Sequence, residues 1–144
     1  MVNKNKKANS PLVSIVTPTY NSADTIARAI TSVLSQTFTN YEIIVVDDAS
    51  TDSTVEIVNR YIEEGAPIKI HSLESNSGAG VARSSGLQLA SGEYVALLDA
   101  DDFWFERKLE VQVAEMNNGA DLCFNSYLRP VSYTHLTLPT IYSV

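Results

Sequence analysis

The chain has 144 residues, a length that suits one domain with a hydrophobic core. Its composition is ordinary for a globular protein, with 44% hydrophobic and 19% charged residues, and no apolar run approaches the roughly 20 residues that span a bilayer. The net charge of −7 argues against a nucleic acid as partner, because phosphate-rich duplexes need a basic surface, but it leaves a single nucleotide open.

Strand-like and helix-like segments alternate along the chain. The strand-like segments are short and apolar, whereas the helix-like segments repeat apolar residues at a helical period. In chain order, the predicted elements are strand 12–18, helix 23–36, strand 41–48, helix 52–65, strand 68–73, helix 79–91, strand 93–99, helix 105–118 and strand 120–125. This alternation predicts an α/β, Rossmann-like domain with a mostly parallel sheet and helices on both faces.

Polar residues follow three of the predicted strands. The segment "PTYN" (18–21) ends the first strand, Asp47 and Asp48 end the second, and the run "DADD" (99–102) follows the fourth. Folds of this class bind ligands at the carboxyl ends of their strands. The three clusters are therefore expected to converge on one site.

The acidic run indicates a metal site. In an extended segment residues i and i+2 share a face, so Asp99 and Asp101 are expected to point the same way. Two such carboxylates repel each other unless a cation lies between them, and their oxygens suit Mg²⁺ or Mn²⁺ rather than zinc. Because Mg²⁺ on one or two carboxylates usually also holds substrate phosphates, the predicted ligand is a diphosphate. Asp102 has two open interpretations, a ligand-side residue or the N-cap of a helix that begins near Phe103.

Two long segments of the sequence carry a family resemblance. They are "VSIVTPTYNSADTIARAITSVLSQTFTNYEIIVVDDASTDST" and "NSGAGVARSSGLQLASGEYVALLDADD", which resemble the GT-A fold glycosyltransferases of family 2. The resemblance covers residues 12–129 and rests on several motifs in the right order. It implies a nucleotide base bound by the first-strand motif and by the acidic residue after the second strand. It also implies that the D-x-D motif after the fourth strand binds a divalent metal and the donor's diphosphate.

The resemblance implies individual roles for the residues that would bind the base. Pro18, Thr19 and Tyr20 would surround the base, and the ring of Tyr20 could stack on it. Asp48 would accept the imide N–H of uracil, and Asp47 would support Asp48. The purely structural alternatives are a cap of the turn into the first helix by Tyr20 and Asn21, and a helix-dipole interaction at Asp47 or Asp48.

Further residues are implied on the phosphate side. Arg83 would lie near the base and phosphates, with a solvated surface cation as its alternative, and Asp101 would be the main metal ligand beside Asp99. Gly78 and Gly80 fit a turn where the backbone approaches phosphate. Together with Asp102, these two glycines are expected in the vicinity of the diphosphate and ribose.

The implied reaction is the metal-dependent transfer of a sugar from a nucleotide diphosphate-sugar, a UDP-sugar by the uracil contact, to a glycan or lipid-linked acceptor. Family 2 enzymes invert the anomeric carbon with a base in their C-terminal portion, so no catalytic residue is assigned in this chain. We expect the chain to bind nucleotide weakly and not to transfer sugar. The single cysteine, Cys123, fits a reducing cytoplasm, and the full-length parent could work at the inner face of the membrane in polysaccharide biosynthesis.

Three alternatives stay open. An inactive nucleotide-binding fragment would keep the donor site alone. A sugar nucleotidyltransferase should carry a Gly-rich, Arg-containing loop after its first strand, which "PTYNSAD" does not supply. A receiver-like signalling domain should carry its acid pair after the first strand rather than the second.

The two ends of the chain differ from its middle. Residues 1–10 hold lysines without an apolar segment behind them and are predicted to be a disordered lead-in rather than a signal peptide. Residues 131–144 contain no Lys, Arg, Asp or Glu, and their first part, "VSYTHLTLPT", resembles a translated transposon-end adapter from sequencing libraries. We expect 131–144 to be a non-native tail, with a natural Thr- and Tyr-rich edge strand as the alternative. Residues 11–130 would then be the incomplete, truncated GT-A domain of a longer protein.

Overall fold

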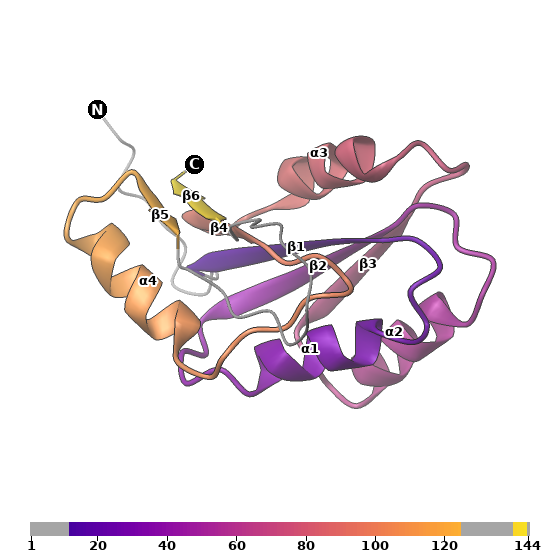
Figure 1. The fold of residues 1–144 in the computed structure, drawn as a ribbon, viewed down its shortest axis with the longest axis horizontal. Coiled ribbons are helices and arrows are strands. Elements are labelled where there is room, and N and C mark those ends of the chain that lie inside the picture. The colour runs from indigo at the N-terminus through magenta and orange to yellow at the C-terminus, as the bar shows by residue number, and fades with distance from the viewer. Residues whose placement is uncertain (1–11, 125–139, 144) are drawn as a thin grey trace, which may run out of the picture.

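The computed structural model describes residues 12–124 and 140–143, in which strands and helices alternate as the sequence predicts (Figure 1). The helices are α1 (Ile26–Leu34), α2 (Thr54–Glu63), α3 (Ala79–Leu89) and α4 (Lys108–Asn117). The strands are β1 (Val13–Thr19), β2 (Tyr41–Asp47), β3 (Ile68–Ser72), β4 (Tyr94–Leu97), β5 (Leu122–Phe124) and β6 (Thr140–Ser143). The α/β, Rossmann-like fold class is confirmed. The lead-in expected over 1–10 lies outside the described residues.

The described strands form one sheet in the order β3-β2-β1-β4-β6-β5. Strands β3, β2, β1 and β4 pair in parallel, whereas β6 runs antiparallel to both β4 and β5. In register, Thr19 pairs with Asp47, and Asp47 pairs with Ser72. The carboxyl ends of β1, β2 and β3 are therefore level at one edge of the sheet.

Strand β6 lies in the segment for which we expect a non-native tail. It pairs with Tyr94–Ala96 of β4 on one side and with β5 on the other, so it lies inside the sheet rather than at an edge. Residues 131–139 and 144 of the same segment lie outside the described residues. A natural strand and a foreign segment could both occupy this place, so the origin of the tail stays a prediction.

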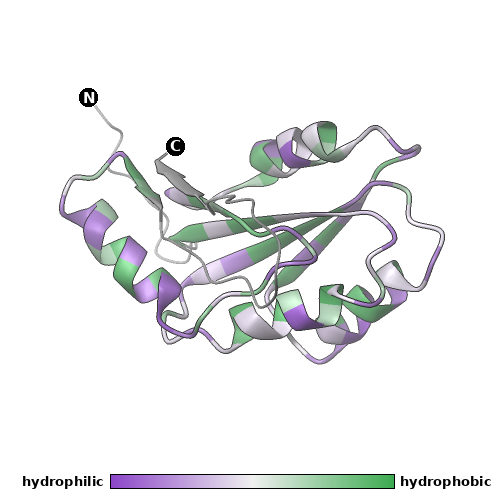
Figure 2. Cartoon of the chain, viewed as in Figure 1, coloured by the Kyte–Doolittle hydropathy of each residue, from purple (hydrophilic) through white to green (hydrophobic). Residues whose placement is uncertain are grey.

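Helices cover both faces of the sheet, with α3 on one face and α1, α2 and α4 on the other (Figure 1). The middle of strand β2 (43–46) is apolar on both faces because each face is covered by helices. Ile43 and Val45 belong to the larger core under α1, α2 and α4, whereas Ile44 and Val46 pack with Ala82 of α3. The apolar residues of the strands stand out in Figure 2. Within the described residues, no helix is long and apolar enough to cross a membrane.

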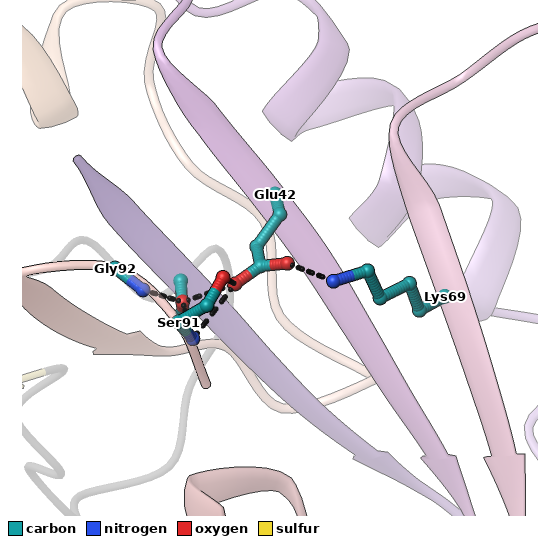
Figure 3. A network of polar contacts seen from close by, with 5 residues as sticks. Glu42, Lys69, Ser91 and Gly92 are labelled. Atoms are coloured by element: carbon teal, nitrogen blue, oxygen red, sulfur yellow. Dashed lines mark hydrogen bonds and ion pairs between the residues drawn. The ribbon is translucent and has the colours of Figure 1, made fainter. Parts of the chain in front are cut away.

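A buried carboxylate ties the α3–β4 connection to the sheet (Figure 3). One oxygen of Glu42 accepts hydrogen bonds from Ser14 Oγ at 2.6 Å and from Ser91 N–H and Oγ at 3.0 and 2.7 Å. Lys69 Nζ lies 2.7 Å from the other oxygen. Burial alone would raise the pKa of Glu42, but the hydrogen bonds from Lys69, Ser14 and Ser91 outweigh it and lower the pKa to about 2. Because Glu42 lies near the start of β2, this network is at the edge opposite the carboxyl ends of the strands.

Candidate active site

A cavity of about 430 Å³ opens where β1, β2 and β4 end and α3 begins. The predicted site residues that line it are Pro18, Thr19, Tyr20, Asp48, Arg83, Asp99 and Asp101. The predicted site residues outside its lining are Asp47, Asp102, Gly78 and Gly80. The polar clusters from three strand ends therefore do meet at one cavity.

The segment between β1 and α1 forms one wall of the cavity. Asn21 has a left-handed backbone with φ of 46°, and its N–H donates to Ser50 Oγ at 2.9 Å. In return, the Thr51 N–H donates to Asn21 Oδ1 at 2.8 Å. These bonds fix the wall to the segment after β2. The Tyr20 side chain, 48% exposed, stays accessible at the cavity, as a ring that stacks on a base must be.

Asp48 is buried and holds the loop that precedes α3. Its two carboxylate oxygens accept the N–H groups of Ser77 and Gly78 at 2.7 and 2.8 Å. Gly78 has φ of 89°, a conformation that only glycine adopts without strain. Asp48 thus accepts the N–H of the residue that precedes α3. The helix-dipole alternative assumed an interaction with α2, the next helix in the chain. Each carboxylate oxygen keeps a second lone pair, so Asp48 can still accept a hydrogen bond from a ligand.

Asp47 is buried and does not belong to the lining of the cavity. One of its oxygens accepts the Ser50 N–H at 3.1 Å. The other oxygen is buried and has no hydrogen-bond partner among the described residues, and the same is true of the neighbouring Thr19 hydroxyl. Asp47 therefore supports the segment after β2.

The acidic run forms a turn and not an extended strand. Strand β4 ends at Leu97, and the Asp102 N–H donates to the Asp99 carbonyl at 3.0 Å. The expectation that Asp99 and Asp101 share a face of an extended segment is therefore wrong, although both residues line the cavity. A turn, and not an extended strand, therefore brings Asp99 and Asp101 to the cavity.

A protein cation already lies beside the acidic turn. Arg83 Nη2 lies 2.7 Å from Asp99 Oδ1, and both side chains remain partly exposed. Arg83 is therefore an ion-pair partner rather than a solvated surface cation. The prediction that the carboxylates need a metal to relieve their repulsion is too strong, because Arg83 relieves part of it.

The acidic turn still has oxygen atoms to offer a metal. No described residue donates a hydrogen bond to the carboxylate of Asp101. The described residues contain no group of three His, Cys, Asp or Glu side chains that could hold an ion. Two carboxylates fit Mg²⁺ or Mn²⁺ nevertheless, because these ions take further ligands from water and substrate phosphates. The donor set therefore fits a metal that binds together with a diphosphate.

The N-cap alternative for Asp102 is wrong. Helix α4 begins at Lys108 after a turn in which the Lys108 N–H donates to the Phe105 carbonyl at 3.0 Å, and the residues of this turn are bonded to the segment after α1. Gln36 Nε2 donates to the Phe105 carbonyl at 2.8 Å, and the Thr37 N–H donates to the Glu106 carbonyl at 2.9 Å. These long-range bonds use the carbonyls that a longer helix would need.

Sequence reasoning missed several residues at the site. Ser22, Asp24 and Thr25 line the cavity beside Tyr20, next to Asn21 of the expected "PTYN" cluster. Arg28 lies outside the lining, but its Nη2 donates to the Asp101 carbonyl at 2.6 Å. In the sequence these are polar residues near the start of an amphipathic helix, a pattern that also fits a solvated face. Only the adjacency of "PTYN" to Ser22 and Asp24 could have indicated them.

Comparison with known proteins identifies the chain's relatives. A family model described as Glycosyl transferase family 2 matches residues 14–141. TuaG of Bacillus subtilis, whose name describes a teichuronic acid biosynthesis glycosyltransferase, is 48% identical over 106 residues, which are 74% of this chain and 42% of TuaG. The Escherichia coli UDP-Glc:alpha-D-GlcNAc-diphosphoundecaprenol beta-1,3-glucosyltransferase WfgD is 41% identical over 81% of this chain and 46% of WfgD.

Solved structures agree with the sequence relatives. S. aureus TarS 1–349 in complex with UDP superposes with a TM-score of 0.81 and 29% identity, over 91% of this chain and 46% of the TarS 1–349 chain. Mannosyltransferase PcManGT from Pyrobaculum calidifontis, in complex with GDP-Man and Mn²⁺, gives a TM-score of 0.72 and 27% identity, over 85% of this chain and 37% of PcManGT. The chain thus spans less than half the length of the relatives it matches. It has the GT-A fold and belongs to glycosyl transferase family 2.

Proposed function

We propose that the cavity binds the nucleotide diphosphate-sugar donor, a UDP-sugar, of a metal-dependent, inverting glycosyltransferase. One observation carries the proposal: an exposed aromatic ring, a buried carboxylate and an acidic turn surround a single cavity at the carboxyl edge of a GT-A sheet. The complexes of TarS 1–349 with UDP and with UDP-GlcNAc support a uridine nucleotide. The dimensions also suit it, since ligand pockets commonly measure about 300–1,000 Å³.

On the nucleotide side, Pro18, Thr19 and Tyr20 surround the base, and the exposed ring of Tyr20 stacks on it. Asp48 accepts the uracil imide N–H with a lone pair that Ser77 and Gly78 leave available. Asp47 holds the segment after β2. This arrangement favours uracil over a base without an N–H at that position.

On the phosphate side, Asp101 and Asp99 provide carboxylate oxygens for Mg²⁺ or Mn²⁺. The bound ion would supply Lewis-acid neutralisation of the charge on the departing diphosphate. Arg83 holds Asp99 in place through their 2.7 Å ion pair and adds a positive charge beside the phosphates. Asp102, Gly78 and Gly80 lie near the diphosphate and ribose without lining the cavity.

The acceptor is proposed to be a glycan or a lipid-linked sugar. The name of WfgD, which describes a diphosphoundecaprenol-linked acceptor, supports this class. Inversion needs a general base on the acceptor side, and we place that base in a part of the family that this chain does not span. The chain alone therefore binds the donor without transferring sugar, and its longer parent works in the cytoplasm at the inner face of the membrane.

Calorimetric titration of the chain with UDP, with and without Mn²⁺, tests the proposal. We expect Mn²⁺ to tighten UDP binding, and we expect Asp101→Asn to remove that gain while leaving metal-free binding in place. Asp48→Asn should weaken UDP binding under both conditions, because it removes the negative charge and replaces one of the two acceptor oxygens with a donor. Asp121→Asn removes the same charge from an exposed position outside the cavity and serves as the control.

Two results would contradict the proposal. One is the absence of UDP binding by a folded wild-type chain. The other is phosphorylation of an aspartate by a small phosphodonor such as acetyl phosphate, which would favour a receiver-like domain. Sugar transfer by the purified chain would overturn only the expectation that the chain is inactive.

A further inference from the structure

Helix α1 and the residues just after it are bonded to the acidic turn and the segment that follows it. The bonding residues are Arg28 and Ser32, which are four apart on one face of α1, and Gln36, which follows the end of the helix at Leu34. Ser32 Oγ accepts the Trp104 N–H at 3.0 Å. Gln36, which is buried, donates to the Phe105 carbonyl at 2.8 Å and accepts the Leu109 N–H at 3.0 Å. These two residues fix the segment between the turn and α4.

Arg28 extends the same row of bonds to the acidic turn itself. Its Nη2 donates to the Asp101 carbonyl at 2.6 Å, and its guanidinium lies 5.5 Å from the centre of the Phe103 ring. The guanidinium of Arg28 thus contacts both Asp101 and Phe103. A bond to a main-chain carbonyl constrains where the neighbouring carboxylate can point, since the Asp101 backbone cannot rotate without breaking it.

The helix also connects the two sides of the cavity. The nucleotide side is lined by Tyr20, Asn21, Ser22, Asp24 and Thr25, and this segment leads directly into the start of α1 at Ile26. Arg28 lies in the first turn of α1 and reaches the acidic side. One helical turn therefore separates the nucleotide wall from the residue that is bonded to the acidic turn.

We propose that Arg28 is a positioning residue that orients Asp101 for the metal and so couples metal binding to nucleotide binding. The proposal rests on the function proposed above. Nothing in the sequence or the family comparison gives Arg28 this role. The ligand is a divalent cation bound together with a nucleoside diphosphate.

The sign of the effect separates positioning from charge. A guanidinium near a metal site repels the cation, so loss of its charge alone should strengthen metal binding. Loss of a positioning bond should weaken it, because Asp101 then samples orientations that do not face the ion. The two explanations therefore predict opposite changes for Arg28→Gln.

The experiment measures the UDP dissociation constant of the whole chain with and without Mn²⁺. For Arg28→Gln we expect the Mn²⁺-dependent gain in UDP affinity to fall by about fivefold or more, the range of typical coupling between sites. Metal-free UDP affinity should stay within about twofold, as for other exposed charge changes. Arg28→Lys keeps the charge and one donor and should restore part of the gain. Arg60→Gln, an exposed arginine on α2 outside the cavity, should match the wild type.

Electron paramagnetic resonance of free Mn²⁺ gives an independent readout. In the presence of UDP, Arg28→Gln should leave more Mn²⁺ free than the wild type at equal concentrations. A gain that is unchanged or larger in Arg28→Gln would overturn the positioning role while leaving the proposed function intact. If the folded wild type shows no Mn²⁺-dependent gain, the proposed metal site and the role of Arg28 are both wrong. Circular dichroism of each variant confirms that it is folded.

Discussion

Individual acidic residues of this chain have different environments, and their partners decide what each can do. Asp48 is buried under the loop before α3 and receives N–H groups on both oxygens. Asp99 is partly exposed and paired with Arg83. Glu42 is buried at the other edge of the sheet with four donor groups around it. Asp48 and Asp99 can contact a ligand, whereas Glu42 serves stability alone.

Glu42 gives a prediction about pH. Its pKa is lowered in the folded chain from an ordinary value of 4.5 to about 2. A carboxyl with a lowered pKa stabilises the fold above its unfolded pKa, so this contribution is complete above about pH 4.5 and is lost as the pH falls towards about 2. At neutral pH, Glu42→Gln should lower the free energy of unfolding by on the order of 2 kcal/mol, because the new amide group faces the Lys69 ammonium. Urea unfolding from about pH 7 down to about pH 3 measures it.

The outcome depends on the difference between Glu42→Gln and the wild type at each pH. That difference should shrink on acidification, since protonation removes the same charge from the wild type. Glu115→Gln, an exposed change on α4, is the control and should show little difference at any pH. A constant difference between Glu42→Gln and wild type across the range would contradict the lowered pKa.

At the scale of elements, the close contact of α3 with the sheet depends on one glycine. Gly86 is buried, and a Cβ there would collide with Val16 Cγ1 of β1. Glycine inside a helix normally costs about 0.5–1 kcal/mol relative to alanine, so Gly→Ala is usually stabilising. Here the side chain of Val16 is locked in a packed strand, and the collision reverses that sign.

We predict that Gly86→Ala destabilises the chain by about 1–3 kcal/mol, as overpacking does in other cores. Gly80→Ala is the matched control on the same helix, because a Cβ at Gly80 meets nothing within 4 Å. That change should be neutral or stabilising by up to about 1 kcal/mol. Thermal and urea unfolding of both variants measure the difference. Equal stability of the two variants would show that α3 can move away from the sheet at no cost.

The elements also show what the sequence could predict. Their order and type follow from local patterns, because a strand covered on both faces is apolar in its middle, as residues 43–46 of β2 are. The start of α4 could not be predicted, since it depends on Gln36 and Thr37, which lie 69 residues before their partners Phe105 and Glu106. A helix pattern contains no information about such a distant competitor for its carbonyls.

At the scale of the whole molecule, the parallel register explains why the site was largely predictable. Residues that follow β1, β2 and β4 must meet at one edge, so their polar clusters identify the cavity. The supporting contacts were not predictable. The sequence around Arg28 is the same whether its side chain is solvated or bonded to Asp101. Only the position of α1 beside the acidic turn shows that it is bonded.

The last prediction concerns the length of the whole protein. The chain spans 42% of TuaG and 46% of WfgD, and residues 131–144 carry none of its Lys, Arg, Asp or Glu residues. An inverting transferase needs an acceptor-side base, which the donor site does not supply. We therefore predict that the source DNA, amplified across codon 130 and sequenced without transposon-based library preparation, continues in frame into charged sequence with an Asp or Glu base. If the codons for "VSYTHLTLPT" are present in that DNA, the tail prediction is wrong. Strand β6 would then be a natural strand of the sheet.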